Sequence, residues 1–585
     1  PPARLHAVEG QQSTIMSLAE LEAFRVETGL DTCRLCQNHC QLTISTFTDG
    51  TRHVSGNRCE RGASTERAPR KSTLPNLYDY KYRRIFGYRR LTAAATTRGD
   101  IGIPRVLNMY ENYPFWFTVL SRLGFRVILS ARTSRDTLAA GAESIPSENV
   151  CFPAKLAHGH LENLLDRGVR TIFYPCVPYE QQAYAEADNH FNCPIVAFYP
   201  QVLEKNVPRL REPGIRYLDP FLNLAEPGHL ASRLVEVFED FDVSIAEATV
   251  AVAEGYAEDA RVKADIRAEG RRGLTWLVEH DAKGIVLAGR PYHVDPETNH
   301  GIPELITGLG LAVFTEDSII DAPLVERPLR VRDQWAYHTR LYEAAAASTL
   351  DPRLEVVQLN SFGCGVDAIT TDQVQEILEA AGNVYTVLKI DEVSNLGAAR
   401  IRLRSLQAAT SGRQPSAEIL THADHAARPV FTKEARRTHT VYIPQMAPIH
   451  FRLASAVLNR LGYRVELLAH ASAADVEVGL KYVNNDACYP AIMVIGQLVN
   501  NFLTGGADPD NSSVAITQTG GMCRATNYAG MLRKGLADSG FGQVPVVAVS
   551  AQGFEENPGF TLGPTLAHRG IQALVIGDLL QTVLL

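Results

Sequence analysis

The sequence predicts an α/β protein with several parallel-sheet domains, an internal duplication and a small N-terminal Cys-rich metal-binding segment. Three observations lead to this prediction. From Ile101 onwards, short apolar runs alternate with helical patterns, which is typical of βα units and a parallel sheet. One stretch of the chain recurs near the C-terminus, and four cysteines lie close together near the N-terminus.

The length of the chain requires more than one hydrophobic core. At 585 residues it exceeds the size at which single cores stop growing, and three or four domains are expected. We expect an N-terminal Cys-rich segment, a first α/β domain, a helical connector with a second α/β domain, and a third α/β domain that repeats the first. Their predicted ranges are residues 1–75, 76–240, 241–410 and 430–585.

The N-terminal part combines a short helix with a basic segment. An amphipathic helix is expected near Ser17–Thr28, ahead of the cysteines, and residues 76–100 are expected to form a basic, aromatic connector. Its basic run, Lys81–Arg90, suits either a solvated surface or contact with an acidic partner. The solvated surface is the preferred interpretation, because charge runs usually serve solubility.

Apolar runs mark the strands of three successive α/β blocks. The first block begins at Arg105–Met109, the second at Gly284 and the third at Thr440. Two segments separate them, a charged, Ala-rich helix over Val243–Asp281 and a polar linker over Thr410–His439. Further strands are expected near Val127, Thr171, Val356, Val514 and Val546.

The first and third blocks share a sequence pattern. Residues Leu120–Val127 match a segment of the same pattern 338 positions later. Cys151-Phe-Pro-Ala matches Cys488-Tyr-Pro-Ala at an offset of 337, and Gly159 matches Gly496 at the same offset. Because separate motifs keep step along the chain, we interpret them as a duplication of one α/β unit.

Composition and charge narrow the possible classes of function. The chain is 45% hydrophobic and 21% charged, as in globular proteins, and its formal charge of −8 argues against a nucleic-acid partner. No apolar stretch reaches the roughly 18–20 residues that span a bilayer, and no hydrophobic signal-peptide core is present. Ten cysteines without an export signal favour reduced thiols and metal ligation in a cytoplasmic protein. The first residue is not Met, so a piece of a longer polypeptide is expected.

The N-terminal cysteines have the spacing of a metal site. Four thiolates can close a tetrahedral zinc site, in which His39 or His53 can replace one of them. The same thiolates can hold an iron–sulfur cluster. The spacing alone does not distinguish between a zinc site, an iron–sulfur cluster and thiols that bind no metal. The pattern C-x2-C-x3-C-x18-C comprises Cys33, Cys36, Cys40 and Cys59.

Six further cysteines occupy loop positions beside Pro or Gly, several of them just past a predicted strand. Ligands of open α/β sheets gather outside the carboxyl ends of the strands, so these loops can converge on one crevice. Glycines let backbone N–H groups approach cluster sulfurs, and Pro stiffens a loop. The alternative is that each cysteine is a small apolar core residue. The set comprises Cys151, Cys176, Cys193, Cys364, Cys488 and Cys523.

Other functional signatures are weak. The sequence has no phosphate-binding loop motif, and no dinucleotide-binding glycine motif follows the first strand of any block. The loop Gly289–His293 suits either an anion held by Arg290 or an ordinary turn, and Asp295–His300 suits acid–base groups or, preferably, a capped helix start. His158 and His160 are expected to be partly buried polar residues rather than ligands.

Several segments between about residues 30 and 585 together resemble one protein family. Besides the Cys-rich opening, they are Asn108–Phe115, Cys193–Val196, Gly289–His293, Ser361–Gly365, Asn485–Pro490 and Gln518–Arg524. The chain thereby resembles the acyl-CoA dehydratase activase-related proteins. These are akin to the 2-hydroxyacyl-CoA dehydratase and benzoyl-CoA reductase superfamily, which includes the double-cubane cluster proteins.

The resemblance implies flavodoxin-like domains that hold iron–sulfur clusters, and an activator ATPase of the actin/Hsp70-like class, in trans or on a missing N-terminal part. In the dehydratase subunits of that superfamily, three cysteines hold one 4Fe–4S cubane in a cleft between domains. In this chain, Cys151, Cys176 and Cys364 match those three cysteines best. A double-cubane 8Fe–9S cluster needs six thiolates, which would add Cys193, Cys488 and Cys523. The third block offers only two cysteines, and the chain itself contains no ATPase.

The sequence therefore predicts an iron–sulfur redox protein that accepts low-potential electrons from an ATP-dependent activator to reduce or dehydrate a small molecule or acyl-CoA. At the N-terminal site the resemblance favours an iron–sulfur cluster over a zinc ion. One rival is a zinc-stabilised scaffold or regulatory subunit without redox chemistry. The other is an ordinary α/β enzyme that binds an anion through Gly289–His293, with incidental cysteines.

Overall fold

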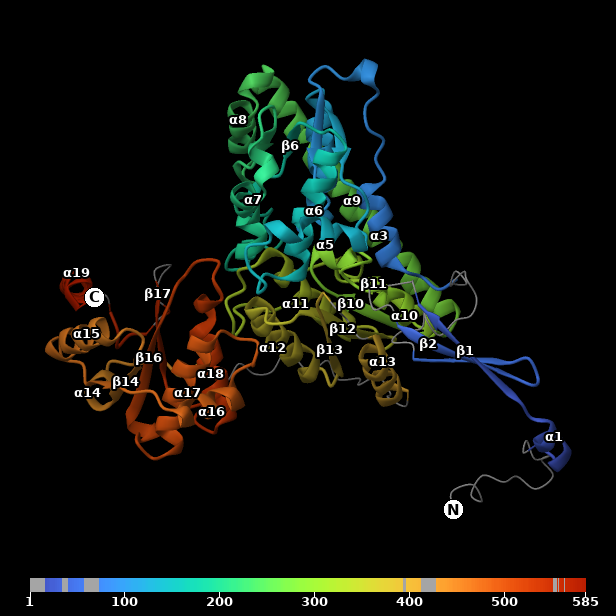
Figure 1. The fold of residues 1–585 in the computed structure, drawn as a ribbon. Coiled ribbons are helices and arrows are strands. Elements are labelled where there is room, and N and C mark those ends of the chain that lie inside the picture. Colours follow the sequence, from blue (N-terminus) through green and yellow to red (C-terminus); the bar gives the residue numbers. More distant parts are fainter. Residues whose placement is uncertain are drawn as a thin grey trace. The chain divides into compact units, whose positions relative to one another are not determined.

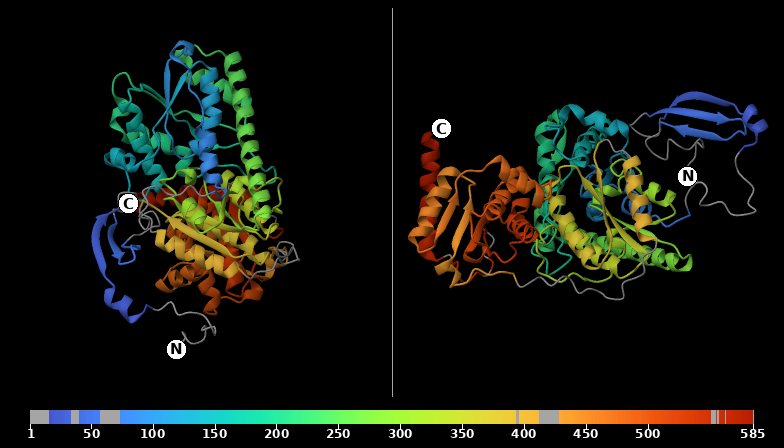
Figure 2. Two further views of the ribbon diagram at one scale, coloured as in Figure 1. Left: turned by 90° about the vertical axis from the view of Figure 1, so that its right-hand side faces the viewer. Right: turned by 90° about the horizontal axis from the view of Figure 1, so that it is seen from below.

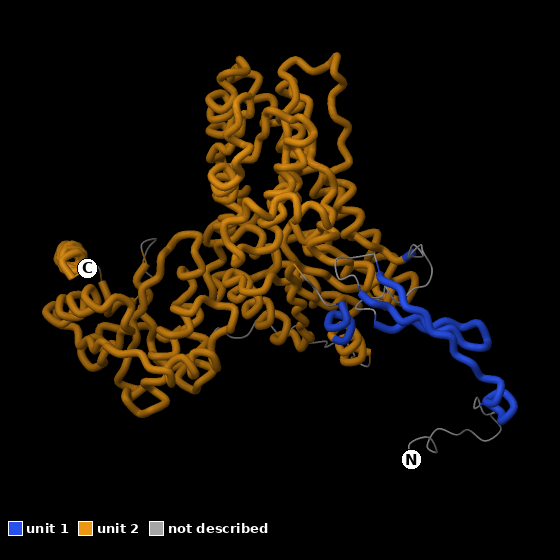
Figure 3. Tube along the Cα trace, viewed as in Figure 1, with its two compact units in different colours: residues 1–73, 393–401 blue, residues 74–392, 402–585 orange. Residues whose placement is uncertain are grey.

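Three parallel, four-stranded sheets with helices packed on them form most of this computed structural model (Figure 1). It describes residues 16–33, 40–56, 73–392, 396–411, 428–550, 555, 557–561 and 563–584. The chain divides into a smaller unit, residues 1–73 with 393–401, and a larger unit, residues 74–392 with 402–585 (Figure 3). Within the described ranges, every helix is too short or too polar to cross a membrane.

The smaller unit contains a short helix and an antiparallel sheet. Helix α1 (Leu18–Ala23) begins at Ser17, whose hydroxyl accepts from the Glu20 amide while the Glu20 carboxylate accepts from the Ser17 amide. This helix is shorter than the Ser17–Thr28 expected, because the chain turns into a strand at Val26 that pairs with β2. The sheet order is β1 (Val26–Thr32), β2 (Gln41–Phe47), β3 (Arg52–Ser55).

The first α/β domain of the larger unit has the sheet order β5–β4–β6–β8. Its first strand is Asp100–Ile103, not Arg105–Met109, because Pro104 follows the buried strand and α4 already begins at Met109. The strands are β4 (Asp100–Ile103), β5 (Arg126–Leu129), β6 (Thr171–Phe173) and β8 (Arg216–Leu218), with β7 (Cys176–Tyr179) and β9 (Phe221–Asn223) paired separately. The helices are α4 (Met109–Arg122), α5 (Arg135–Gly141), α6 (Phe152–Asp166), α7 (Pro194–Asn206) and α8 (Pro227–Val237).

The second α/β domain has the sheet order β11–β10–β12–β13. Its strands are β10 (Gly284–Ala288), β11 (Ala312–Thr315), β12 (Leu354–Ser361) and β13 (Tyr385–Ile390). Its helices are α10 (Ile302–Gly308), α11 (Ala336–Thr349) and α12 (Gly365–Ala380), and α13 (Leu396–Thr410) follows β13 in the chain.

The third α/β domain has the sheet order β15–β14–β16–β17. Its strands are β14 (Thr440–Pro444), β15 (Val465–Leu468), β16 (Ser512–Gln518) and β17 (Val546–Ser550). Its helices are α14 (Ala435–Thr438), α15 (Pro448–Arg460), α16 (Ala473–Tyr482), α17 (Tyr489–Leu503), α18 (Tyr528–Asp538) and α19 (Pro564–Leu584).

All three sheets place their first strand between the second and the third, which is the flavodoxin-like order. This confirms the predicted fold class of several parallel-sheet domains. The matching glycines of the two related blocks have one structural role. A Cβ atom on Gly159 would overlap the backbone of Thr137 in α5, and one on Gly496 would overlap the backbone of Asp475 in α16. Each glycine therefore lets two neighbouring helices of its domain approach closely.

Two helices join the first and second domains. The long helix α9 (Ile245–Glu279), green in Figure 2, packs along α3 (Leu77–Phe86), α4 and α8, and also contacts β11. The prediction that Lys81–Arg90 is a solvated surface is wrong for Lys81, because this residue is only 1% exposed. Its Nζ lies 2.7 Å from an Asp317 carboxylate oxygen and 3.5 Å from one of Glu316. A buried ammonium is tolerated there because acidic groups of the second domain surround it.

Candidate functional site

Five of the six scattered cysteines sit at the start of a helix. Because the first N–H groups of a helix have no partner within it and carry positive partial charge, this position favours a thiolate over a thiol. The Sγ atom of Cys193 lies 3.4 Å from the Val196 amide, and that of Cys523 lies 3.5 Å from the Ala525 amide. The N-cap residues are Cys151 of α6, Cys193 of α7, Cys364 of α12, Cys488 of α17 and Cys523 of a 3-10 turn, Arg524–Asn527.

Three of these thiols gather around the buried side chain of Arg290. Its Nη2 lies 2.7 Å from the Cys364 Sγ, and its Nη1 lies 4.0 Å from the Cys193 Sγ. Burial raises the pKa of Cys151 to about 12, with the nearby Cys193 adding to the rise and Arg290 opposing it. Burial also raises the pKa of Cys364, against the attraction of Arg290. The group of Cys151, Cys193, Cys364 and Arg290 is called the Arg290 thiol site below.

The two neighbouring strands β10 and β12 position Arg290 and its carboxylate partner. Arg290 follows β10, and its Nη2 lies 2.5 Å from the Asp367 Oδ1 on the first turn of α12, which follows β12. The turn after β10 requires Gly289, because a Cβ atom there would lie 2.5 Å from the His293 Nδ1 that accepts from the Arg290 amide. Parallel strands deliver their carboxyl ends to one edge, so the pair lies where α/β sheets bind ligands.

Buried polar atoms without a hydrogen-bond partner lie beside the Arg290 thiol site. Among the described residues these include the Tyr292 hydroxyl and both side-chain polar atoms of Asn108. Tyr292, Asn108, Cys193 and Arg290 line a small cavity of about 10 Å³. Burial raises the pKa of Tyr292 well above its usual value, so its hydroxyl stays a hydrogen-bond donor. Such donors beside thiolates suit a sulfur-rich or anionic group.

The third domain contributes a second pair of thiols near another arginine. The Cys488 Sγ lies 3.0 Å from the Tyr528 hydroxyl. Burial acts to raise the pKa of Cys488, but the bonds from Tyr528 and from the Ala491 amide, together with Arg524, lower it below its usual value. Cys523, next to Arg524, is exposed.

The two groups of thiols are connected through the second domain. Gly365, directly after Cys364, leaves room for the Arg524 side chain, which a Cβ atom there would overlap. The Trp335 indole donates to the Met522 carbonyl at 2.9 Å, and the Ala336 amide donates to the Phe191 carbonyl at 3.0 Å. One segment of the second domain thus touches the chain next to Cys523 and the chain just before Cys193.

The remaining predicted ligands lie elsewhere or outside the described residues. Cys176 is buried at the start of β7, where burial and then Asp219 raise its pKa to about 12. Cys33 and Cys40 are buried and pair through their backbones, with the Cys33 amide donating to the Cys40 carbonyl at 2.8 Å. Cys36, Cys59 and His39 lie outside the described residues. Across the described part of the chain, no three His, Cys, Asp or Glu side chains are arranged to hold a metal ion.

The other polar motifs have structural roles. Asp295 Oδ1 accepts from the Glu297 amide at 2.8 Å and the Thr298 amide at 3.1 Å, so it closes a turn. The predicted capped helix start is wrong, because α10 begins only at Ile302 and its N-cap residue is Gly301. His158 and His160 are fully buried and bond to hydroxyl groups, the former to Tyr199 at 2.9 Å. Neither histidine faces the thiols.

Sequence reasoning missed the arginine partners of the thiols. The sequence of Gly289–His293 suggests an anion loop or a turn, whereas the Arg290 guanidinium is directed at two cysteine sulfurs and a carboxylate. Asp367 and Tyr528 were not singled out. The signal for Arg524 was present in the sequence, since it directly follows Cys523.

Comparison with known proteins supports an activase-related family for part of the chain. Residues 100–319 match the family model described as the CoA enzyme activase uncharacterised domain (DUF2229). No match was found among curated proteins. The matched range includes the first domain, α9, and β10 and β11 of the second domain, and it contains Cys151, Cys176, Cys193 and Arg290.

Proposed function

We propose that this chain is an iron–sulfur redox protein that accepts low-potential electrons from an ATP-dependent activator of the actin/Hsp70-like class. Its reaction would be the reduction or dehydration of a small molecule or acyl-CoA. The observation that carries the proposal is the position of three cysteines, each at the N-cap of a helix, around buried Arg290. The match of residues 100–319 to a CoA enzyme activase domain agrees with a role in such a system.

The donor set fits a cluster in its chemistry. Thiols are the usual ligands of iron–sulfur clusters, which store and pass single electrons, and hydrogen bonds to sulfur tune their potential. Cys151, Cys193 and Cys364 would be the ligands, so for the trio we propose Cys193 in place of Cys176. The guanidinium of Arg290 and the hydroxyl of Tyr292 would donate hydrogen bonds to sulfur. Cys488 and Cys523 would bring the set to five thiolates, one fewer than a double-cubane cluster needs, so a single four-iron cluster is the form we propose for the Arg290 thiol site.

The Arg290 thiol site has too little space for a cluster, so part of the chain would have to move when a cluster binds. A cavity of about 10 Å³ is far smaller than a four-iron cluster. The loop that precedes α12 would be the part that moves, because Phe362 is 56% exposed and little packing would be lost there. Outward movement of this loop would separate Cys364 from Arg290 and open the site.

Cluster reconstitution tests the proposal. Anaerobically purified protein should bind iron and sulfide, turn brown and give a low-temperature EPR signal on reduction. Cys193→Ala and Cys364→Ala should lose that signal, whereas the control Cys176→Ala should keep it, because the charged group that acts on the pKa of Cys176 is Asp219 and not Arg290. Cys33→Ala should affect only a separate N-terminal site, which we propose to hold a cluster or zinc.

Two results would reject the redox function. One is a protein that stays colourless and free of iron after reconstitution. The other is a metal content of one zinc per chain with no iron, which would favour a zinc-stabilised scaffold. If Cys176→Ala loses the signal and Cys193→Ala keeps it, the proposed choice of ligands is wrong although the function stands.

A further inference from the structure

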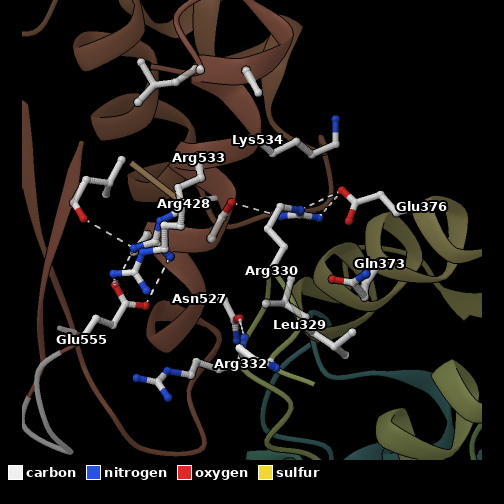
Figure 4. A pocket seen from close by; sticks show the side chains of 18 of the residues that line it. Leu329, Arg330, Arg332, Gln373, Glu376, Arg428, Asn527, Arg533, Lys534 and Glu555 are labelled. Atoms are coloured by element: carbon white, nitrogen blue, oxygen red, sulfur yellow. Dashed lines mark hydrogen bonds and ion pairs between the residues drawn. The ribbon is translucent and has the colours of Figure 1, made fainter. Parts of the chain in front are cut away.

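A large cavity lies between the second and third domains, and Arg290 is not among the residues that line it. It holds about 900 Å³, a size typical of sites for small molecules. Its walls come from α12, from α18 and from the segment 326–332 that runs between them. Figure 4 shows labelled side chains from both domains that line this space.

One wall of the cavity has two arginines for one carboxylate. Arg428 and Arg533 both form ion pairs with Glu555, as Figure 4 shows. Burial lowers the pKa of Arg428, and the adjacent charge of Arg533 lowers it further despite Glu555. A second anion at this wall would therefore relieve repulsion between two guanidinium groups.

The other cations of the lining already have their own carboxylates. A guanidinium nitrogen of Arg330 lies 2.7 Å from a carboxylate oxygen of Glu376, and a guanidinium nitrogen of Arg332 lies 2.7 Å from one of Asp188. Lys534 pairs with Asp538 one helical turn away. Glu326 is a further acidic residue of the lining. The positive excess is thus local, at the pair of Arg428 and Arg533.

The remainder of the lining is largely apolar, with Gln373, Gln518, Thr526 and Asn527 as its uncharged polar residues. Side chains from both domains contribute to it, among them Leu329, Val331, Ile377, Leu536 and Val544. Apolar residues in the same cavity as a guanidinium pair match a molecule with a short hydrocarbon part and one anionic head, since each part finds a suitable surface.

We propose that this cavity binds a small amphiphilic anion, with its carboxylate or phosphate head on Arg428 and Arg533 and its hydrocarbon part against Leu329, Ile377 and Val544. The site is independent of the Arg290 thiol site, so it stands whether or not the chain holds a cluster. Glu555 competes with the ligand head for the same two guanidinium groups. Because the cavity is shared by two domains, occupancy would also hold those domains together.

Calorimetric titration of the full chain with three probes tests the site. Octanoate and octyl phosphate should bind, and octanol, which lacks the charge, should bind at least about tenfold more weakly. The tighter of the two anions identifies the preferred head group. Arg533→Gln and Arg428→Gln should each weaken octanoate binding roughly tenfold. Glu555→Gln should strengthen it several-fold, because the competing carboxylate is removed.

A control and a set of contrary outcomes make the test decisive. Arg452→Gln, an exposed change on α15 outside the cavity, should leave octanoate binding unchanged. Circular dichroism checks that each variant is folded, and Arg428→Gln suits this check because the Arg428 side chain is 37% exposed. Equal binding of octanoate and octanol would overturn the proposal. So would unchanged binding in both arginine variants, or weaker binding in Glu555→Gln.

Discussion

The Arg290 guanidinium lies 2.7 Å from the Cys364 sulfur, and it is also bound to Asp367 three residues further along the chain. Burial opposes the charge of Arg290, but the attraction of Asp367 and Cys364 raises its pKa well above the usual value. The cation is therefore permanent. It stabilises whatever negative charge develops on the surrounding thiols, so the Arg290 thiol site is prepared for thiolates even though burial disfavours them.

Arg290→Gln should make Cys364 a weaker acid. Without the cation, burial dominates and the pKa of the thiol rises further. Alkylation of Cys364 by iodoacetamide at pH 8, followed by mass spectrometry, should slow roughly tenfold. Arg290→Lys keeps the positive charge and should slow the reaction less. An unchanged rate in Arg290→Gln would show that the guanidinium does not influence this thiol.

Cys488 should be alkylated before Cys151 when the pH is raised from 7 to 9. The thiolate is the reactive form, and the pKa of Cys488 is lowered whereas that of Cys151 is raised to about 12. Tyr528→Phe removes the hydrogen bond to the Cys488 sulfur, so its reaction should slow while that of Cys151 does not change. Quantitative peptide mapping over a pH series measures both rates. Faster reaction of Cys151 than Cys488 at every pH would contradict the prediction.

Gly159→Ala and Gly496→Ala should destabilise the protein to a similar extent. A methyl group at either position overlaps the backbone of the adjacent helix, which costs about 2–3 kcal/mol through overpacking. Gly535→Ala on α18 is the control, because its nearest atoms would be 3.5–3.7 Å away. It should be neutral or stabilising by up to about 1 kcal/mol. Urea unfolding followed by circular dichroism gives the differences, and equal stability of all three variants would be the contrary result.

Much of the fold could be predicted because buried parallel strands appear as short apolar runs. The strands expected near Val127, Thr171, Val356, Val514 and Val546 correspond to β5, β6, β12, β16 and β17. The first strand was misplaced because Arg105–Met109 has a similar apolar content to Asp100–Ile103, and the helical periodicity of α4 overlaps it.

The candidate site could be predicted only in part, because its partners are distant in the sequence. Lys81 was expected in solvent, since a local charge run does not show that Asp317 lies 2.7 Å from its Nζ. Cys176 and Cys193 both lie directly beside a Pro. Which of them faces Arg290 depends on the path of the chain between β7 and α7, which local sequence patterns do not determine.

Three buried histidines should make the protein sensitive to mild acid. Burial lowers the pKa of His158 to about 4, and burial together with a nearby arginine lowers those of His160 and His293 to about 3. In the unfolded chain the same groups take up a proton near pH 6.5. Below that pH the unfolded state binds more protons than the folded state, so the free energy of unfolding falls as the pH decreases.

The free energy of unfolding should therefore decrease by about 3 kcal/mol per pH unit between pH 6 and 5. Each of these three histidines contributes about 1.4 kcal/mol per unit, and His338, whose pKa burial also lowers, acts in the same direction. Asp333, whose pKa burial raises to about 6, offsets about one histidine. Urea titrations at pH 7, 6 and 5, followed by the fluorescence of buried Trp116, measure the slope. The double variant His158→Gln/His160→Gln should be less stable at pH 7 but lose less stability on acidification. His229→Gln, at an exposed position, should keep the parent slope, and a parent stability that is flat from pH 7 to 5 would refute the prediction.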